Sequence, residues 1–190
     1  MRAIVLFAVF AAGCVRLPPP RRPLDALSAE EHYKLGAAYE AEGENDAAVA
    51  RYRAAVNKDK KFAPAWLALG NRAFSSGAFA EAETCYRKAL ENSPADASAS
   101  NNLAATYLAR SKRLAEAESL LRDALAKGGD GPLRPYVLDT LANLYLKEKR
   151  YDEARVAVDA GLDSARPADK RVREKLTMTR SSLDAAIARE

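Results

Sequence analysis

The sequence is poor in the side chains from which catalytic and metal centres are built. Its 190 residues include two cysteines and one histidine. A catalytic centre needs a nucleophile, a base and an orienting group that converge, and a zinc site takes about four nitrogen or sulfur ligands. The glycine cluster at 128–131 lacks the lysine and the serine or threonine that complete a phosphate-binding loop. We therefore expect no enzyme, no metal, no cofactor and no small-molecule substrate.

Long apolar runs and a one-sided charge are also missing. The apolar run 3–13 has eleven residues, whereas a helix that spans a bilayer needs about 20. The 30 basic and 26 acidic residues are scattered along the chain and leave a net charge of +4, so no basic stripe marks a nucleic-acid partner. Alanine is abundant while isoleucine and valine are scarce. This composition favours one folded domain built from helices.

The run 3–13 ends directly before Cys14. Its length fits the ~7–15-residue apolar core of a signal peptide, and small residues precede the cysteine as a signal peptidase requires. The segment Ala11–Cys14 resembles the lipobox of bacterial lipoproteins. The resemblance implies that residues 1–13 are removed and that Cys14 carries a lipid. Because Val15 follows rather than an aspartate, it also implies an outer-membrane anchor facing the periplasm. The alternative is an ordinary signal peptide with an incidental cysteine.

A proline-rich stretch, 14–27, follows the apolar run. Pro18, Pro19 and Pro20 are consecutive, and Pro23 lies just beyond them. Proline lacks the backbone N–H and fixes φ, so the stretch runs extended rather than helical. We expect a stiff spacer that holds the folded body away from the membrane. A ligand for an SH3-like partner is the alternative.

Small residues recur through the rest of the chain at a regular spacing. Gly36, Gly70, Ala104 and Ala142 are separated by 34, 34 and 38 residues. Four further columns keep nearly the same spacing: Tyr39, Ala73, Tyr107 and Tyr145; Ala48, Ala82, Ala117 and Ala154; Tyr52, Tyr86, Leu121 and Val158; Ala55, Ala89, Ala124 and Gly161. Several sets of similar residues that recur at the same spacing indicate an internal repeat.

The second repeat resembles the tetratricopeptide signature, a helix-turn-helix of 34 residues. Trp66–Gly70, Ala82, Tyr86, Ala89 and Pro94 carry the resemblance. It implies an all-α fold, a right-handed α-solenoid of four helix hairpins plus a C-terminal capping helix. The repeat domain is expected at 28–167, with repeats at about 29–62, 63–96, 97–134 and 135–168. Small residues suit the points where two helices cross closely, and Ser28 with Glu31 predicts a capping box at the first helix.

The last stretch, 168–190, has Val172, Leu176, Leu183 and Ile187 at helical spacing. One apolar stripe and one charged face predict a helix that covers the last repeat and exposes its own charged side to solvent. A helix lying on a membrane surface is the alternative.

His32 and Cys85 both fall in the repeat pattern and are interpreted as packing residues. A Cys85–His32 catalytic dyad is the alternative, and it would require contact between different repeats.

In tetratricopeptide domains the first helix of each hairpin lines the concave face of the superhelix. Carried over to this chain, the resemblance implies the following partner-binding residues: Tyr33, Leu67, Asn71, Phe74, Asn101, Leu108, Tyr136, Asp139 and Asn143. An asparagine amide can both accept from and donate to an extended peptide backbone, while the apolar side chains can take apolar side chains of the ligand. A scaffold role for the asparagines is the alternative.

These features predict a membrane-anchored lipoprotein that binds another protein or a peptide segment without catalysis. The chain looks similar to the tetratricopeptide lipoproteins that help secretins or pilus machinery reach the outer membrane. Three alternatives stay open: an adaptor for peptidoglycan-modifying enzymes, a periplasmic scaffold secreted without lipid, and an enzyme subunit or hydrolase.

Overall fold

The computed structural model describes residues 26–128 and 131–189, and this part of the chain folds into nine helices without a strand. Their bounds are α1 Ala29–Ala41, α2 Asn45–Lys58, α3 Ala63–Ser75, α4 Phe79–Asn92, α5 Ala97–Ala109, α6 Leu114–Gly128, α7 Arg134–Lys147, α8 Tyr151–Ser164 and α9 Lys170–Ile187. The predicted signal peptide, Cys14 and all but the end of the predicted spacer lie outside the described residues.

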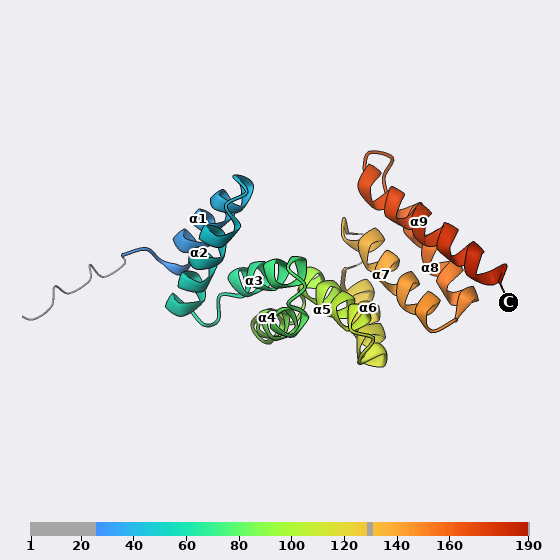
Figure 1. The fold of residues 1–190 in the computed structure, drawn as a ribbon, viewed down its shortest axis with the longest axis horizontal. Coiled ribbons are helices and arrows are strands. Elements are labelled where there is room, and N and C mark those ends of the chain that lie inside the picture. Colours follow the sequence, from blue (N-terminus) through green and yellow to red (C-terminus); the bar gives the residue numbers. More distant parts are fainter. Residues whose placement is uncertain (1–25, 129–130, 190) are drawn as a thin grey trace, which may run out of the picture.

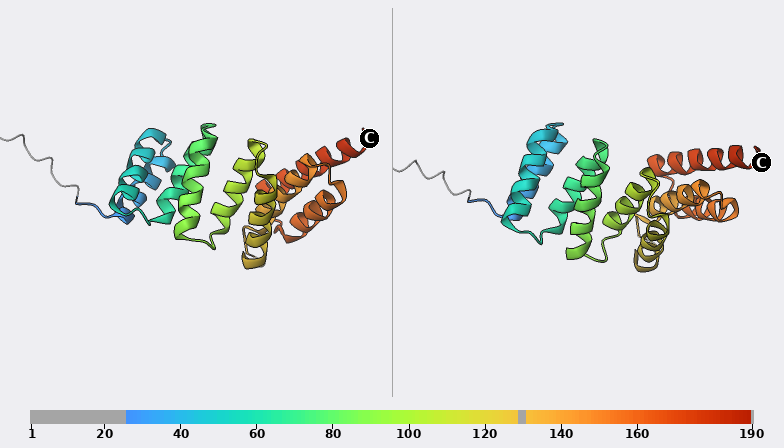
Figure 2. Two further views of the ribbon diagram at one scale, coloured as in Figure 1. Left: turned by 90° about the horizontal axis from the view of Figure 1, so that it is seen from below. Right: turned by 60° about the horizontal axis from the view of Figure 1, so that its bottom comes forward.

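The helices pair in chain order into four antiparallel hairpins that stack from one end of the molecule to the other (Figures 1 and 2). Each hairpin packs on the next, and α9 packs on both α7 and α8. The prediction of an all-α helical repeat fold is confirmed. None of the described helices combines the length and the apolar character needed to cross a bilayer.

The helices α1 and α5 begin at residues whose side chains accept hydrogen bonds from free backbone N–H groups. The predicted capping box is confirmed: Glu31 N–H donates to Ser28 Oγ at 3.2 Å, and Ser28 N–H donates to Glu31 Oε2 at 2.7 Å. Asp96 Oδ1 accepts from the N–H of Ala99 at 2.9 Å at the start of α5. Pro64 sits in the first turn of α3, where its missing N–H removes no helical hydrogen bond.

The turn inside each hairpin places at least one residue at positive φ. In the first two hairpins it is Gly43 (φ 82°) and Gly77 (φ 77°), whereas the last two use Ser111 (φ 52°) and Lys149 (φ 61°). The turn of the third hairpin holds four residues between its helices and the other turns hold three. Arg113 in this turn is also at positive φ (54°). The extra residue explains why Ala117 lies 35 residues after Ala82, whereas Ala82 lies 34 residues after Ala48.

The small residues of the repeat columns lie where the two helices of a hairpin cross. A Cβ on Gly36 would lie 2.6 Å from the ring of Tyr52, and a Cβ on Gly70 would lie 2.5 Å from the ring of Tyr86. In the third and fourth hairpins the same columns hold alanine with the smaller Leu121 and Val158, and all four side chains are buried in the main core. Glycine thus accompanies tyrosine and alanine accompanies an aliphatic side chain, which keeps the crossing closely packed.

The curvature of the stack follows from which helices touch. The first helix of one hairpin contacts the first helix of the next along the series α3, α5 and α7, and α7 contacts α9 in the same way. Within the described residues, the second helices α4, α6 and α8 show no contact of comparable extent with one another. The first helices therefore lie on the inner side of the curve, and we call this side the concave face.

Candidate functional site

A hollow of about 470 Å³ opens on the concave face between α3 and α5. We call it the amide pocket, and its lining residues are Asn71, Phe74, Ser75, Tyr86, Asn102, Ala105 and Arg171. The first three come from the end of α3, Asn102 and Ala105 from the middle of α5, and Arg171 from the first turn of α9. Segments about one hundred residues apart in sequence therefore build one site.

The orientation of Asn71 is fixed by two hydrogen bonds. Its Oδ1 accepts from Tyr86 Oη at 3.0 Å and from Asn102 Nδ2 at 2.8 Å. Because both donors bind the carbonyl oxygen, the NH₂ group of Asn71 is the part of the amide left to face the pocket. Burial raises the pKa of Tyr86, so this hydroxyl stays a donor at neutral pH.

Arg171 adds a cation to this set of donors. Its side chain is exposed and forms no hydrogen bond or ion pair within the described part of the chain. Phe74 gives the pocket an apolar wall and packs edge to face on Phe79, with ring centroids 5.4 Å apart. The lining of the pocket therefore combines two amides and a guanidinium with aromatic surface.

The remaining predicted residues of the first three repeats serve packing at least in part. The ring of Tyr33 lies 5.7 Å from the rings of both Tyr52 and Phe62 and helps join the first two hairpins. Leu67 and Leu108 are half-buried against the main core. Asn101 donates to Asn102 Oδ1 at 3.3 Å, and its own Oδ1 is buried without a partner in the described residues.

The predicted residues of the fourth repeat lie against α9. Tyr136 packs beside the cluster around Leu176. Thr179 donates to Asp139 Oδ1 at 2.8 Å, and Asn143 Nδ2 lies 3.2 Å from Thr179 Oγ1. Burial raises the pKa of Asp139. The expected groove therefore does not run open along α7, because the C-terminal helix covers this part of the concave face.

Sequence reasoning placed Asn71 and Phe74 on the groove and missed Asn102 and Arg171. Asn102 directly follows the predicted Asn101, and only the exact rotation of α5 decides which of the two amides enters the pocket. The approach of Arg171 to α3 depends on the curvature of the whole stack. No local pattern in the sequence could have shown it.

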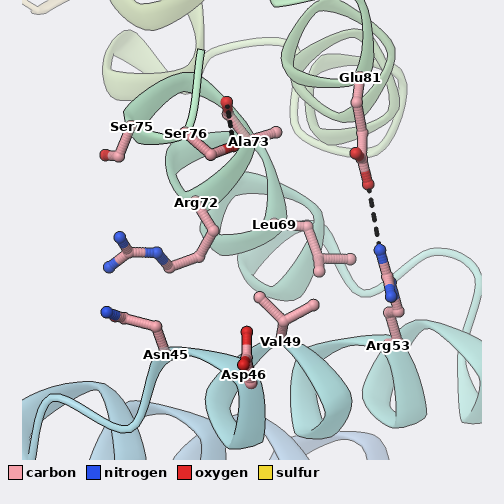
Figure 3. A pocket seen from close by; sticks show the side chains of 10 residues that line it. All are labelled: Asn45, Asp46, Val49, Arg53, Leu69, Arg72, Ala73, Ser75, Ser76 and Glu81. Atoms are coloured by element: carbon pink, nitrogen blue, oxygen red, sulfur yellow. Dashed lines mark hydrogen bonds and ion pairs between the residues drawn. The ribbon is translucent and has the colours of Figure 1, made fainter. Parts of the chain in front are cut away.

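A second hollow, of about 350 Å³, lies where α2 meets α3 and α4 (Figure 3). Val49 and Leu69 face each other at its centre, and an ion pair between Arg53 and Glu81 at 3.4 Å closes one side. Asp46 and Arg72 bring further charges of both signs to the rim. Since neither sign prevails, this hollow favours no particular ligand charge.

A third hollow, of about 520 Å³, lies between α6, α7 and α8. Its walls are mainly aliphatic, from Leu125, Leu138 and Leu141, and Val156 on its rim is 69% exposed. Asp152 and Glu153 border it on α8. This apolar hollow is separate from the amide pocket, which is lined by other helices.

Arginine–carboxylate pairs join consecutive repeats. Arg72 reaches Glu40 at 2.9 Å across the first junction, and Arg110 binds Glu83 across the second. At the third junction Arg150 contacts Glu118 at 2.7 Å. Glu118 also accepts from the hydroxyl of Tyr145 at 3.0 Å, and these donors, led by Arg150, lower the pKa of the Glu118 carboxyl to about 2.

His32 and Cys85 are both buried. Cys85 packs in a cluster with Tyr52, Val56 and Leu69 between the first two hairpins. Burial raises the pKa of the Cys85 thiol to about 11, so the thiol is protonated at neutral pH and is a poor nucleophile. In the described residues, no three histidine, cysteine, aspartate or glutamate side chains are placed to hold a metal ion.

The chain resembles known families and structures in its repeats. The tetratricopeptide repeat model matches residues 33–97 and 67–132, and no curated protein matches significantly. The chain is similar in fold to the solved structures of PilF from Pseudomonas aeruginosa (23% identity, TM-score 0.66, covering 86% of this chain and 74% of that one) and MamA (17%, 0.66, 84% and 86%). It is also similar to YrrB (18%, 0.63, 83% and 86%), described as a repeat protein with an unusual peptide-binding site.

The matched segments together span 33–132, more than half of the 190 residues. They fall on helices that stack as paired hairpins with small residues at each crossing. This chain belongs to the tetratricopeptide repeat family.

Proposed function

We propose that this protein is a non-catalytic scaffold that binds an extended segment of a partner protein on its concave face. The observation that carries the proposal is the amide pocket. It is an open hollow between two first helices where polar donors and an aromatic wall meet. Stacked repeats present extended concave surfaces suited to binding other chains.

The chemistry of the pocket suits a peptide. Backbone carbonyl groups of an extended segment are acceptors, and the outward NH₂ group of Asn71 is a donor without a partner in the described chain. Phe74 offers apolar surface to a side chain of the ligand. The similar repeat protein YrrB has a peptide-binding site, which supports the same class of ligand here.

The partner can bind only to the part of the concave face that α9 leaves uncovered. Because α9 covers Tyr136, Asp139 and Asn143 on α7, the proposed contact surface extends over the first three hairpins. Phe74, Asn71 and Asn102 lie at its centre. Leu67 and Leu108, half-buried on α3 and α5, would extend it along these helices.

We further propose that the protein works at the bacterial envelope. The basis is the sequence alone: an apolar run of eleven residues that ends on Ala11–Cys14, followed by a proline-rich spacer. With a diacylglycerol on Cys14 and a further acyl chain, attachment is stable, because each buried methylene contributes ~0.8 kcal/mol. The scaffold would then act at the periplasmic side of the outer membrane, as an assembly factor for a pilus or secretion machine.

The groove proposal is tested by filling the pocket. Ala105→Arg places a long side chain into the amide pocket from α5, where arginine is a good helix former. Ala50→Arg makes the same change at an exposed position of α2, a second helix that does not line the pocket. Partners crosslinked to the protein in cells and identified by mass spectrometry should disappear with the first variant and persist with the second. Equal recovery with both variants would refute the groove proposal.

The anchor is tested independently. Radiolabelled palmitate should enter the wild-type protein and not Cys14→Ser, and globomycin should cause the precursor to accumulate. A wild-type protein that takes up no label would show that the anchor proposal is wrong, without bearing on the groove.

A further inference from the structure

The third junction between hairpins differs from the two earlier ones. Each junction carries an arginine five residues after the column alanine of one second helix and a glutamate one residue before the column alanine of the next. These alanines are Ala48, Ala82, Ala117 and Ala154. Arg53 and Glu81 form an ion pair at 3.4 Å across the first junction (Figure 3), and Arg87 and Glu116 form one at 2.8 Å across the second. Both pairs connect the second helices of neighbouring hairpins.

At the third junction the equivalent residues are Arg122 on α6 and Glu153 on α8, and they form no ion pair with each other in the described part of the chain. Arg122 binds Glu118 on its own helix at 2.9 Å, and Glu153 pairs with Arg150. The third hollow therefore stays open between α6 and α8, without the bridge that closes one side of the second hollow.

The wall that α8 gives the third hollow is also apolar where the earlier second helices are polar. The wall is set by the residues two and six positions after the column alanine. They are Thr84 and Lys88 in α4, Ser119 and Asp123 in α6, and Val156 and Ala160 in α8. Val156 is 69% exposed beside the leucines of the hollow. An open aliphatic hollow with an exposed valine on its rim indicates a surface that another chain covers.

A second exposed apolar surface lies on α9. Met178 is 70% exposed and lies on the side of α9 opposite the buried Leu176. Beside it, the hydroxyl of Thr177 donates to the backbone carbonyl of Arg173 at 2.8 Å, and the hydroxyl of Ser181 donates to that of Thr177 at 3.1 Å. Because these hydroxyls already have acceptors within the helix, covering this side of α9 leaves neither donor unsatisfied.

The two surfaces also have complementary charge. Helix α8 carries four acidic residues and one basic residue, whereas α9 carries five basic and two acidic residues. Within the molecule, Arg180 on α9 pairs with Asp159 on α8 at 2.6 Å. Asp152 on the rim of the hollow and Lys170 on α9 are exposed and form no ion pair in the described part of the chain. Each surface thus offers the other an unpaired charge of opposite sign.

We propose that the third hollow of one molecule receives the exposed side of α9 of a second copy, with Met178 of that copy packed beside Val156. Helix α9 of the same molecule does not reach the hollow. Helix α7 turns Leu138 and Leu141 towards the hollow and Asp139 towards α9, so the hollow and α9 lie on opposite sides of α7.

This contact joins two different surfaces, so it is heterologous. Each molecule in a pair keeps one free hollow and one free α9, and association continues into a ring or an open chain of copies. The amides and the aromatic wall of the amide pocket take no part in the contact. Self-association is therefore independent of the proposed binding of a partner on the concave face.

The test uses two differently tagged copies of the full-length protein, mixed in detergent micelles and recovered through one tag. Val156→Asp places a charge at the hollow, and Met178→Asp places one on the exposed side of α9. Both side chains are mostly exposed, so the variants should fold, and circular dichroism checks that they do. Wild type should recover wild type, whereas neither variant should recover a second copy of itself.

A mixture of the two variants tests the heterologous geometry. Val156→Asp keeps an intact α9 and Met178→Asp keeps an intact hollow, so the two should recover each other through the one remaining contact. In sedimentation experiments this mixture should stop at a dimer, while the wild type should form larger species as its concentration rises. Ala50→Asp, at an exposed position of α2, is the control and should associate like the wild type.

Three results would overturn the proposal: a wild type that stays monomeric at every concentration, variants that recover themselves as well as the wild type does, or two variants that fail to recover each other. Equal recovery in all pairings would reflect shared micelles and would also overturn it. The proposed binding function fails separately, when Ala105→Arg leaves partner crosslinking unchanged.

Discussion

At the scale of single residues, backbone conformation determines which side chain a hairpin turn tolerates. The turns place Gly43 and Gly77 at positive φ, but the third and fourth hairpins put Ser111 and Lys149 in the same left-handed region. A residue with a Cβ has a conformational cost there that glycine avoids. The later turns are therefore less favourable than the earlier ones.

Exchanging residues between these turns should change stability in opposite directions. Ser111→Gly should stabilise the protein by ~1 kcal/mol, because glycine relieves the left-handed strain, and Gly77→Ala should destabilise it by a similar amount. Urea denaturation of the two variants and the wild type measures both effects. If Ser111→Gly were the destabilising variant, the turn conformation described for the third hairpin would be wrong.

A single carboxyl also ties stability to pH. Hydrogen bonds from Arg150, and further ones from Tyr145 and Arg122, lower the pKa of Glu118 to about 2 in the folded protein, whereas its ordinary value is 4.5. Because the pKa is lowered in the folded state, the ionised Glu118 contributes fully to the free energy of unfolding above pH 4.5. This contribution is lost as the pH falls from 4.5 towards 2.

Glu118→Gln should therefore lower the free energy of unfolding by about 2 kcal/mol at pH 7. Below pH 4.5 the free energy of unfolding should fall less steeply with pH in this variant than in the wild type. Glu30→Gln removes a carboxylate from an exposed pair with Lys34, and it should change both quantities little. Urea denaturation at a series of pH values distinguishes the two. A Glu118→Gln curve parallel to that of the wild type would contradict the pKa assignment.

At the scale of helices, the crossing inside each hairpin is a matched pair of side chains. Gly70 lies against the ring of Tyr86, and a Cβ added there would come within 2.5 Å of the ring, which leaves no room for alanine. In the third hairpin the same two columns hold Ala104 and Leu121, both fully buried in the main core. Either pair fills the space, but mixing them overfills or underfills it.

A double-mutant cycle tests this matching. Gly70→Ala should cost ~1–3 kcal/mol by overpacking, and Tyr86→Leu should also destabilise because it removes ring contacts and the hydrogen bond to Asn71. The double variant should be less destabilised than the sum, with a coupling of about 1 kcal/mol. Strict additivity in urea denaturation would show that the two residues do not share the crossing.

The docking of α9 depends on a polar contact as well as on its apolar stripe. Thr179 is buried and donates to Asp139, while Thr177 on the same helix is exposed and binds only within that helix. Thr179→Val should leave Asp139 short of a donor and weaken docking by ~1–3 kcal/mol, whereas Thr177→Val should have little effect.

Hydrogen exchange locates this change. In Thr179→Val the amides of α9 should exchange faster while those of α1 to α4 keep their protection, since α9 contacts only the last hairpin extensively. Equal exchange of α9 in the two variants would mean that the Thr179–Asp139 contact does not hold the helix.

At the scale of the whole molecule, the fold could be predicted because the residue patterns that specify it lie within single hairpins and recur from one hairpin to the next. The spacing of Gly36, Gly70, Ala104 and Ala142 reflects a crossing that every hairpin must form. The C-terminal helix could also be predicted, from its apolar stripe. Each of these signals lies within one hairpin or one helix.

The candidate site could be predicted only in part, because it depends on how hairpins rotate against each other. Asn71 and Phe74 lie in the pocket as expected from their repeat positions, yet Asp139 and Asn143, chosen by the same rule, contact α9. Arg171 is brought to α3 by the accumulated curvature of the intervening hairpins. A repeat pattern specifies each unit, and small rotations between units decide the surface they form.

The central claim is that the concave face, and not the outer side of the stack, receives the partner. The most direct measurement places a photo-crosslinking amino acid at Ala105 in the amide pocket or at Val156, which is 69% exposed beside the third hollow. Irradiation in cells should give a discrete crosslinked partner from position 105 and only a second copy of this chain from position 156. The same partner crosslinked from position 156 and absent from position 105 would contradict the account.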